Sequence, residues 1–214
     1  MDNEISLVIG DKAWSSWSLR PWLAIKISKI PFREELVQLR RPDTAAGIAK
    51  HSPSGRVPAL KHGALTVWDS LAICEYLAEL APEAGLWPQD AGERAAARAV
   101  SAEMHSGFQA LRKEFPMNFH ARMSGCAPSE QARADIERIV RIWCGLRGKS
   151  GAVGPFLFGT FTIADAMYAP VATRFRTYCL DLAAYGDDGS AASYAQTILA
   201  MPAMTEWGEE AARG

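Results

Sequence analysis

The sequence predicts two structural units, an α+β domain with the element order β-α-β-α-β-β-α and an all-helical domain after it. In the first 80 residues, short β-branched runs alternate with segments of helical spacing. Beyond residue 90 the apolar spacing is helical throughout. Residues 81–88 (APEAGLWP) hold two prolines and one glycine, a composition typical of a linker. We therefore expect a first domain over 1–81, a linker over 82–89 and a helical domain over 90–214.

The elements of the first domain follow in order. The β-branched run ISLVIG at 5–10 predicts a buried strand, and apolar residues at helical spacing over 19–30 predict a helix with Pro21 in its first turn. A strand–helix–strand start implies a parallel pair, and a hairpin around His62-Gly63 adds antiparallel strands. The result is a four-stranded mixed sheet covered by three helices, with the remaining elements expected at 34–39, 43–50, 57–60, 65–68 and 71–80.

Capping residues mark the helices of the second domain. Asp90 can begin a long helix that reaches Phe115, and Ser129 can begin another over 130–145. The segment Thr162-Ile163-Ala164-Asp165 predicts a capping box, in which Asp replaces the usual Glu, at the start of a helix that ends near Tyr178. A loop over 186–190 then precedes a helical tail in which Pro202 suits a first turn.

Composition excludes several classes of function. The 214 residues carry 23 Lys+Arg against 24 Asp+Glu, so the chain lacks the basic excess that nucleic-acid binding needs. No window approaches 18 uncharged apolar residues, which argues against a membrane span. The N-terminus Met1–Glu4 is acidic, so we expect a cytoplasmic rather than an exported protein. The four cysteines form no C-x-x-C pair and have no histidine at metal spacing, so we expect neither a dithiol redox site nor a metal.

A serine-rich segment lies between the first predicted strand and the first predicted helix. It reads AWSSWSLR over 13–20 and places hydroxyl groups at the edge of the sheet, beside the N-terminus of a helix. Open N–H groups and the helix dipole favour an anion at such a point. The simpler interpretation is that one serine only caps the helix.

Two further segments predict binding groups in the same domain. Pro58 follows Val57 at the start of a predicted strand, which favours either a special turn with a cis peptide bond or an ordinary edge proline. Asp69 and Ser70 open a predicted helix, where Asp69 could accept from an ammonium group and the helix start could bind a carboxylate. Together these groups match the α-end of an amino acid, although Ser70 could serve only as the N-cap.

Taken together, these motifs resemble those of the cytosolic glutathione transferases. The resemblance rests on SSWS, on SPSGRVPAL over 52–60, on VWDSLAICEYL over 67–77 and on TIAD over 162–165. The serines are most similar to the serine-type classes, in particular the zeta motif S-S-C-S-W, although Trp17 replaces its cysteine. The resemblance implies a thioredoxin-like first domain, a helical-bundle second domain, glutathione as cosubstrate and a homodimer.

The resemblance also implies roles for individual residues. The hydroxyl of Ser15, or alternatively that of Ser16, would donate to the glutathione sulfur and so favour its thiolate. Arg56, and as further candidates Arg40 or Arg41, could meet the glycyl carboxylate. The residues expected to bind glutathione are Trp17, Arg56, Val57, Pro58, Asp69 and Ser70, with Pro58 in the cis form.

For the acceptor substrate, the resemblance implies a site between the two domains. Met104, Phe108, Leu111 and Phe115 form an apolar stripe beside His105, and such a stripe is equally typical of a core. His105, Phe108 and Arg174 are the residues expected to contact the acceptor, with Arg174 suited to an acidic one. The implied activity is thiolate attack on small hydrophobic electrophiles. The alternatives are a glutathione-dependent isomerase of the maleylacetoacetate type and a binding or scaffold protein without turnover.

Overall fold

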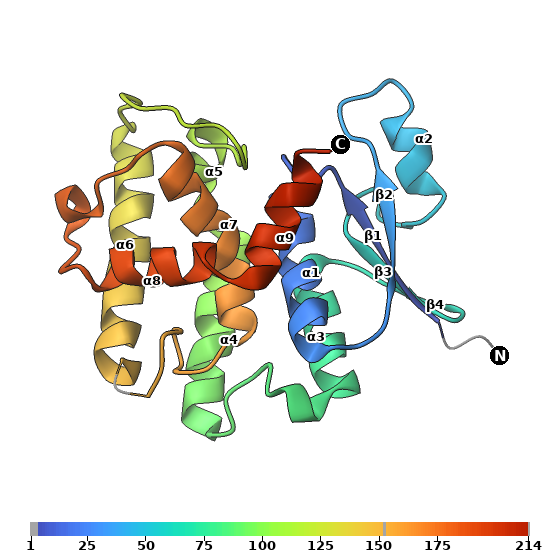
Figure 1. Cartoon of the computed structure of the whole chain (residues 1–214), viewed down its shortest axis with the longest axis horizontal. Coiled ribbons are helices and arrows are strands. Elements are labelled where there is room, and N and C mark those ends of the chain that lie inside the picture. The colour runs from blue at the N-terminus through green and yellow to red at the C-terminus, as the bar shows by residue number, and fades with distance from the viewer. Residues whose placement is uncertain (1–3, 152, 214) are drawn as a thin grey trace.

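A four-stranded mixed sheet organises the first 80 residues in the computed structural model, which describes residues 4–151 and 153–213 (Figure 1). The strand order is β2-β1-β3-β4, with β1 and β2 parallel and the other two pairs antiparallel. This confirms the predicted fold of the domain. Of the acidic N-terminal segment, residues 1–3 lie outside the described part. The elements are β1 (Ile5–Gly10), α1 (Ser16–Ser28), β2 (Arg33–Val37), α2 (Thr44–Ala49), β3 (Ala59–His62), β4 (Leu65–Val67) and α3 (Ser70–Leu80).

The alternation along β1 explains why helices cover both faces of the sheet. Leu7 and Ile9 point into the main hydrophobic core, together with α1 and α3. Val8 points to the other face, where it packs in a small cluster with Ile48 of α2. Figure 1 shows α1 and α3 between the sheet and the helical domain, so the first helix of the chain lies at the boundary of the two domains.

The second domain is helical, as predicted, and begins after a short 3-10 turn, η1 (Pro82–Ala84). Ser129 caps α6, which continues five residues beyond the predicted end at Gly145. Among the described helices, none combines the length and the apolar composition needed to cross a bilayer. The elements are α4 (Ala91–Ser106), α5 (Gln109–Glu114), α6 (Glu130–Ser150), α7 (Ile163–Thr177), η2 (Leu182–Tyr185), α8 (Ser190–Leu199) and α9 (Pro202–Ala211).

The helix predicted to run unbroken from Asp90 to Phe115 is instead two helices, and that prediction was wrong. Phe108 adopts a left-handed backbone conformation with φ of 59°, which ends α4 and begins α5. The guanidinium of Arg112 folds back onto the end of α4 and donates to the carbonyls of Met104 and Gly107. It therefore satisfies carbonyl groups that the break would otherwise leave without partners.

Helix α7 is the central element of the helical domain and begins with the predicted capping box. Thr162 and Asp165 exchange hydrogen bonds with each other's backbone. The Asp165 carboxylate also accepts from Leu157 N at 3.0 Å and from the Tyr194 hydroxyl at 3.0 Å. Burial raises the pKa of Asp165 to about 6, although these donors oppose the shift. Since α7 packs against both α1 and α4, this cap fixes one side of the domain boundary.

Candidate functional site

The serine-rich segment forms a hydrogen-bonded chain at the start of α1. Ser15 is the N-cap, and its Oγ accepts from Ser18 N at 3.4 Å. The Ser15 hydroxyl donates to Ser18 Oγ at 2.7 Å, and Ser18 Oγ also accepts from Gly10 N at 3.0 Å. The third serine therefore connects the end of β1 to the helix cap. Its contribution was missed from the sequence, where Ser18 was only one of several possible caps.

Ser16 has a different partner, Arg174 of α7. The Arg174 Nη2 atom donates to Ser16 Oγ at 3.2 Å, so Arg174 reaches the domain boundary, as the sequence suggested. Its other donors bond Phe115 O and Pro170 O. Burial, and then the nearby Arg112, lower the pKa of Arg174 to about 9.

A cavity of about 460 Å³ opens beside this segment, between the first domain and α4. Neither Ser15 nor Ser16 lines it, and both are buried. The Val57–Pro58 peptide bond is cis, which confirms that prediction. The cavity brings together all six residues expected to bind glutathione, namely Trp17, Arg56, Val57, Pro58, Asp69 and Ser70, and adds Ser54, Trp68 and His105.

Asp69, rather than Ser70, caps α3. Its Oδ1 accepts from the backbone N–H groups of Leu71 and Ala72, while its Oδ2 lies 2.9 Å from His105 Nε2. The cap interpretation of Ser70 was therefore wrong, because the extended residue one position earlier reaches the open N–H groups first. The Ser70 hydroxyl is buried and has no hydrogen-bond partner among the described residues. It remains available to a ligand in the cavity.

Three arginines, Arg20 of α1, Arg112 of α5 and Arg174 of α7, lie close together, and two of them pack on the ring of Trp17. The guanidinium carbons of Arg20 and Arg112 lie 4.2 and 4.7 Å from the centroid of the Trp17 ring, and the edge of the His105 ring contacts the same indole. Arg20 is fully buried, and none of its three nitrogen atoms bonds another described residue. Burial, followed by Arg112 and Arg174, lowers its pKa.

Arg20 and Arg174 are buried and bond no carboxylate among the described residues, which is unusual because a buried charge normally requires a counter-ion. Of the three arginines, sequence reasoning identified only Arg174. Arg20 is four residues after Ser16 on α1, so helical spacing could have placed it on the same face. Its burial was not predicted, because α1 packs against both α3 and α7.

Other predicted positions lie outside the cavity. Phe108 is buried at the break between α4 and α5, and Met104, Leu111 and Phe115 are also buried, which supports the core interpretation of that stripe. Arg40 stacks on Trp14 and, with Arg41, lines a separate cavity of about 620 Å³. One group of potential metal ligands occurs among the described residues, and its members are Cys144, Asp187 and Asp188. The two carboxylates already accept hydrogen bonds from backbone N–H groups at the start of α8.

Comparison with known proteins agrees with this geometry. Residues 14–80 match the family model of the glutathione S-transferase N-terminal domain, and residues 94–207 match that of the C-terminal domain. A probable maleylacetoacetate isomerase of Caenorhabditis elegans is 28% identical over 174 residues, which cover 80% of this chain and 79% of that protein. Maleylpyruvate isomerase of a Ralstonia species is 28% identical over 185 residues, covering 80% of this chain and 83% of that protein.

A solved structure shows the same fold. A glutathione transferase homologue from Burkholderia, solved with bound glutathione, has a TM-score of 0.71 at 22% identity over 99% of each chain. The two family models account for most of this chain and correspond to its two observed domains. The chain therefore belongs to the glutathione S-transferase family of enzymes.

Proposed function

We propose that this enzyme activates glutathione as a thiolate through the hydroxyl of Ser15 and transfers the sulfur to small electrophiles. A thiol with a pKa near 8.5 is only about 3% ionised at pH 7, so activation requires that the pKa be lowered. The observation that carries this proposal is the chain of hydrogen bonds from Gly10 through Ser18 to Ser15 at the N-terminus of α1.

This chain suits the stabilisation of a negative sulfur. Rotation of the Ser15 hydroxyl away from Ser18 would free its proton for a sulfur bound at the N-terminus of α1, beside the cavity. Ser15 Oγ would then accept from both the N–H and the hydroxyl of Ser18, and each bond would polarise the next. The open N–H groups and the dipole of α1 add to the stabilisation of the anion. Serine suits the role because its hydroxyl donates without forming a mixed disulfide.

The remaining cavity residues suit the rest of the tripeptide. Val57 lines the cavity and would pair through its backbone with the cysteinyl part. The γ-glutamyl carboxylate would take the free Ser70 hydroxyl at the start of α3, and its ammonium group would take Asp69 Oδ2 in place of His105.

In the transfer reaction, the sulfur lone pair attacks an electrophilic carbon and a C–S bond forms. The leaving group departs with its bonding electron pair. In an addition to a conjugated double bond, a proton from water completes the product instead. Holding both reactants in one cleft supplies the proximity that accelerates this step.

A second candidate is glutathione-dependent isomerisation, in which the sulfur adds to a double bond, the bond rotates and the sulfur leaves unconsumed. The arginine cluster of Arg20, Arg112 and Arg174 favours this candidate, since buried guanidinium groups suit an acceptor that carries a carboxylate. The relatives named maleylacetoacetate and maleylpyruvate isomerase favour it as well.

Ser15→Ala tests the proposal, with Ser16→Ala as the matched variant. We expect Ser15→Ala to raise the pKa of bound glutathione by about 1 to 2 units and to lower turnover near pH 6.5 by about 10- to 100-fold, with little change in affinity. The ultraviolet absorbance of the thiolate, followed across pH, reports that pKa. Wild-type behaviour of Ser15→Ala would contradict the proposal, and the same loss in Ser16→Ala alone would move the role to Ser16.

Glutathione consumption separates the remaining alternatives. Transfer consumes glutathione with a model electrophile, whereas isomerisation does not. Binding of glutathione without turnover of either kind would identify a scaffold protein.

We further propose that the protein is a cytoplasmic homodimer. Large exposed apolar side chains support a second copy as the covering surface, since Trp68, which lines the cavity, is 47% exposed and Leu65 of β4 is 46% exposed. Light scattering coupled to size exclusion would measure the mass in solution.

A further inference from the structure

The helical domain holds the loop between β1 and α1 by its backbone. Phe119 N donates to Ala13 O at 3.0 Å, and Trp207 Nε1 donates to Lys12 O at 2.8 Å. Trp207 lies on α9, the last helix of the chain. Two successive carbonyls of the loop are therefore fixed by residues far along the sequence.

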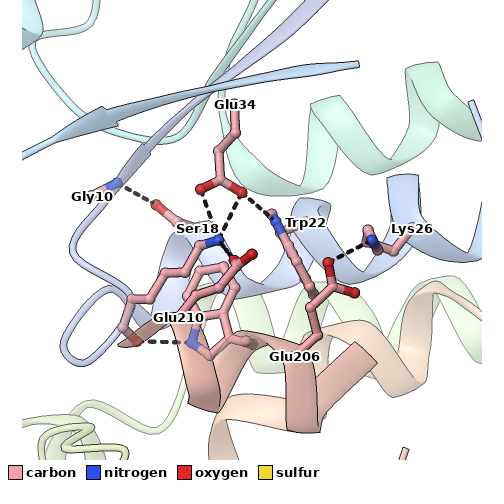
Figure 2. Close-up of polar contacts among 9 residues, drawn as sticks. Gly10, Ser18, Trp22, Lys26, Glu34, Glu206 and Glu210 are labelled. Carbon is pink, nitrogen blue, oxygen red and sulfur yellow. Dashed lines mark hydrogen bonds and ion pairs between the residues drawn. The ribbon is translucent and has the colours of Figure 1, made fainter. Parts of the chain in front are cut away.

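Lys12 carries a second connection to α9 through its side chain. Its ammonium group contacts Glu34 Oε1 at 2.7 Å and also bonds Glu210 of α9. The indole rings of Trp22 and Trp207 lie 5.0 and 5.3 Å away, so carboxylates and aromatic rings enclose the cation. Lys12 is only 7% exposed. Figure 2 shows Glu34 and Glu210 converging from opposite sides on this point.

The loop is tight enough to transmit the position of Lys12 to the serine. Asp11 O accepts from Trp14 N at 3.1 Å and from Ser15 N at 2.8 Å, which closes a turn around Lys12. Ser15 is the last residue of that turn and is also the N-cap of α1. A displacement of Lys12 would therefore move the Ser15 hydroxyl.

We propose that Lys12 is a positioning residue for thiol activation, which ties α9 to the serine loop and fixes Ser15 Oγ against the bound sulfur. This inference rests on the proposed role of Ser15. Through this contact Glu210 of α9, which is 198 residues from Lys12 in the sequence, would support the chemical step. A misplacement of a reacting group by about 1 Å can cost about 100-fold in rate.

A neighbouring ion pair provides a matched control. Lys26 Nζ lies 2.8 Å from Glu206 Oε1, and this pair joins α1 to α9 without touching the loop (Figure 2). Its lysine also stacks on Trp22, at 5.4 Å. Lys26→Met therefore removes another ion pair between α1 and α9 and leaves the carbonyls of the loop in place.

The experiment compares Lys12→Met, Lys12→Arg and Lys26→Met in the full chain, by titrating the thiolate absorbance of bound glutathione. For Lys12→Met we expect the pKa of the thiol to rise by about one unit and kcat near pH 6.5 to fall about tenfold, with KM for glutathione nearly unchanged. Arginine keeps the charge and can bond both carboxylates, so Lys12→Arg should restore most of the activity. Lys26→Met should titrate as the wild type does.

A wild-type titration curve for Lys12→Met would overturn the inference, as would an equal shift in Lys26→Met. If Lys12→Met does not fold, Trp207→Phe and Glu210→Gln decide the question. Each removes one connection and should shift the pKa in the same direction, and unchanged curves in both would overturn the inference. A shift in Ser15→Ala without one in Lys12→Met would leave the proposed function intact, whereas no shift in Ser15→Ala would defeat the function itself.

Discussion

The two walls of the interdomain cleft are built from different chemistry. The wall from the first domain offers hydroxyl and backbone groups at Val57 and Ser70, with the Ser15 cap buried beside it. On the other side of Trp17, the helical domain and α1 supply the guanidinium groups of Arg112, Arg174 and Arg20, and the last two bond no carboxylate among the described residues. Short polar groups in fixed turns suit one invariant cosubstrate, whereas buried cations discriminate among acceptors by charge. Cosubstrate binding and acceptor preference should therefore respond to different substitutions.

The largest expected effect comes from a substitution in the N-terminal capping box of α7, in the helical domain. In Asp165→Asn one oxygen becomes an NH₂ group that faces donors, so we expect a loss of about 2 to 4 kcal/mol in the free energy of unfolding at pH 7. Chemical denaturation would measure this loss. Because α7 positions Arg174, acceptor turnover should fall with stability, while the hydroxyl wall keeps its affinity for glutathione. A stability within about 0.5 kcal/mol of the wild type would contradict this account of the cap.

The same carboxyl group predicts a pH dependence of stability. Burial raises the pKa of Asp165 to about 6 from 3.8, so the folded state holds the proton more tightly than the unfolded state. Its contribution is therefore present below the unfolded pKa and is lost as the pH rises through the folded one. Between pH 5 and pH 7, the wild type should lose about 1.3 kcal/mol relative to Asp165→Asn, which does not titrate there. Parallel stability curves for the two proteins would show that the group titrates normally.

A smaller effect is expected when one charge is removed from the arginine cluster. Arg20→Met removes a buried guanidinium that has no described partner, so stability should hold or rise. The preference for an electrophile carrying a carboxylate over its methyl ester should fall about tenfold, close to the value of one charged hydrogen bond. Arg98→Met is the control, because Arg98 also stacks on a tryptophan, Trp87, but is exposed and pairs with Glu75. An unchanged preference in Arg20→Met would exclude the cluster as the acceptor's carboxylate site.

The smallest expected effect concerns the contact between Asp69 and His105, which joins the two domains. His105→Leu removes the partner that occupies Asp69 Oδ2, so KM for glutathione should fall about two- to threefold, consistent with the modest value of a half-exposed pair. With a neutral electrophile kcat should stay unchanged. Steady-state kinetics at fixed electrophile concentration would measure both constants. A rise in KM would mean that His105 assists binding of glutathione rather than competing with it.

The elements predicted correctly from the sequence are those whose signals lie within a few residues. The capping box at Thr162–Asp165, the cis bond at Pro58 and the hairpin are set by local geometry, so a single motif specifies each. The serine-rich segment was placed correctly for the same reason.

The features that the sequence did not reveal depend on long-range packing. The apolar spacing continues through Phe108, so periodicity predicts one helix, whereas the side chains of Arg112 and Gln109 reach back to carbonyls at the end of α4. The burial of Arg20 accompanies the packing of α1 against α3 and α7, which no local pattern specifies. The choice of Asp69 over Ser70 as the cap depends on a single position between two residue types that both cap well.

The backbone bonds from Phe119 and Trp207 to the loop beside the serines have a consequence for recombination. An exchange of whole domains at the linker between this enzyme and a relative would keep the local sequence of each half intact. It would also replace the donors that hold the carbonyls of Ala13 and Lys12. A chimera should therefore be active only when its helical domain supplies these two donors to the loop of its first domain. Neither domain determines the activity alone.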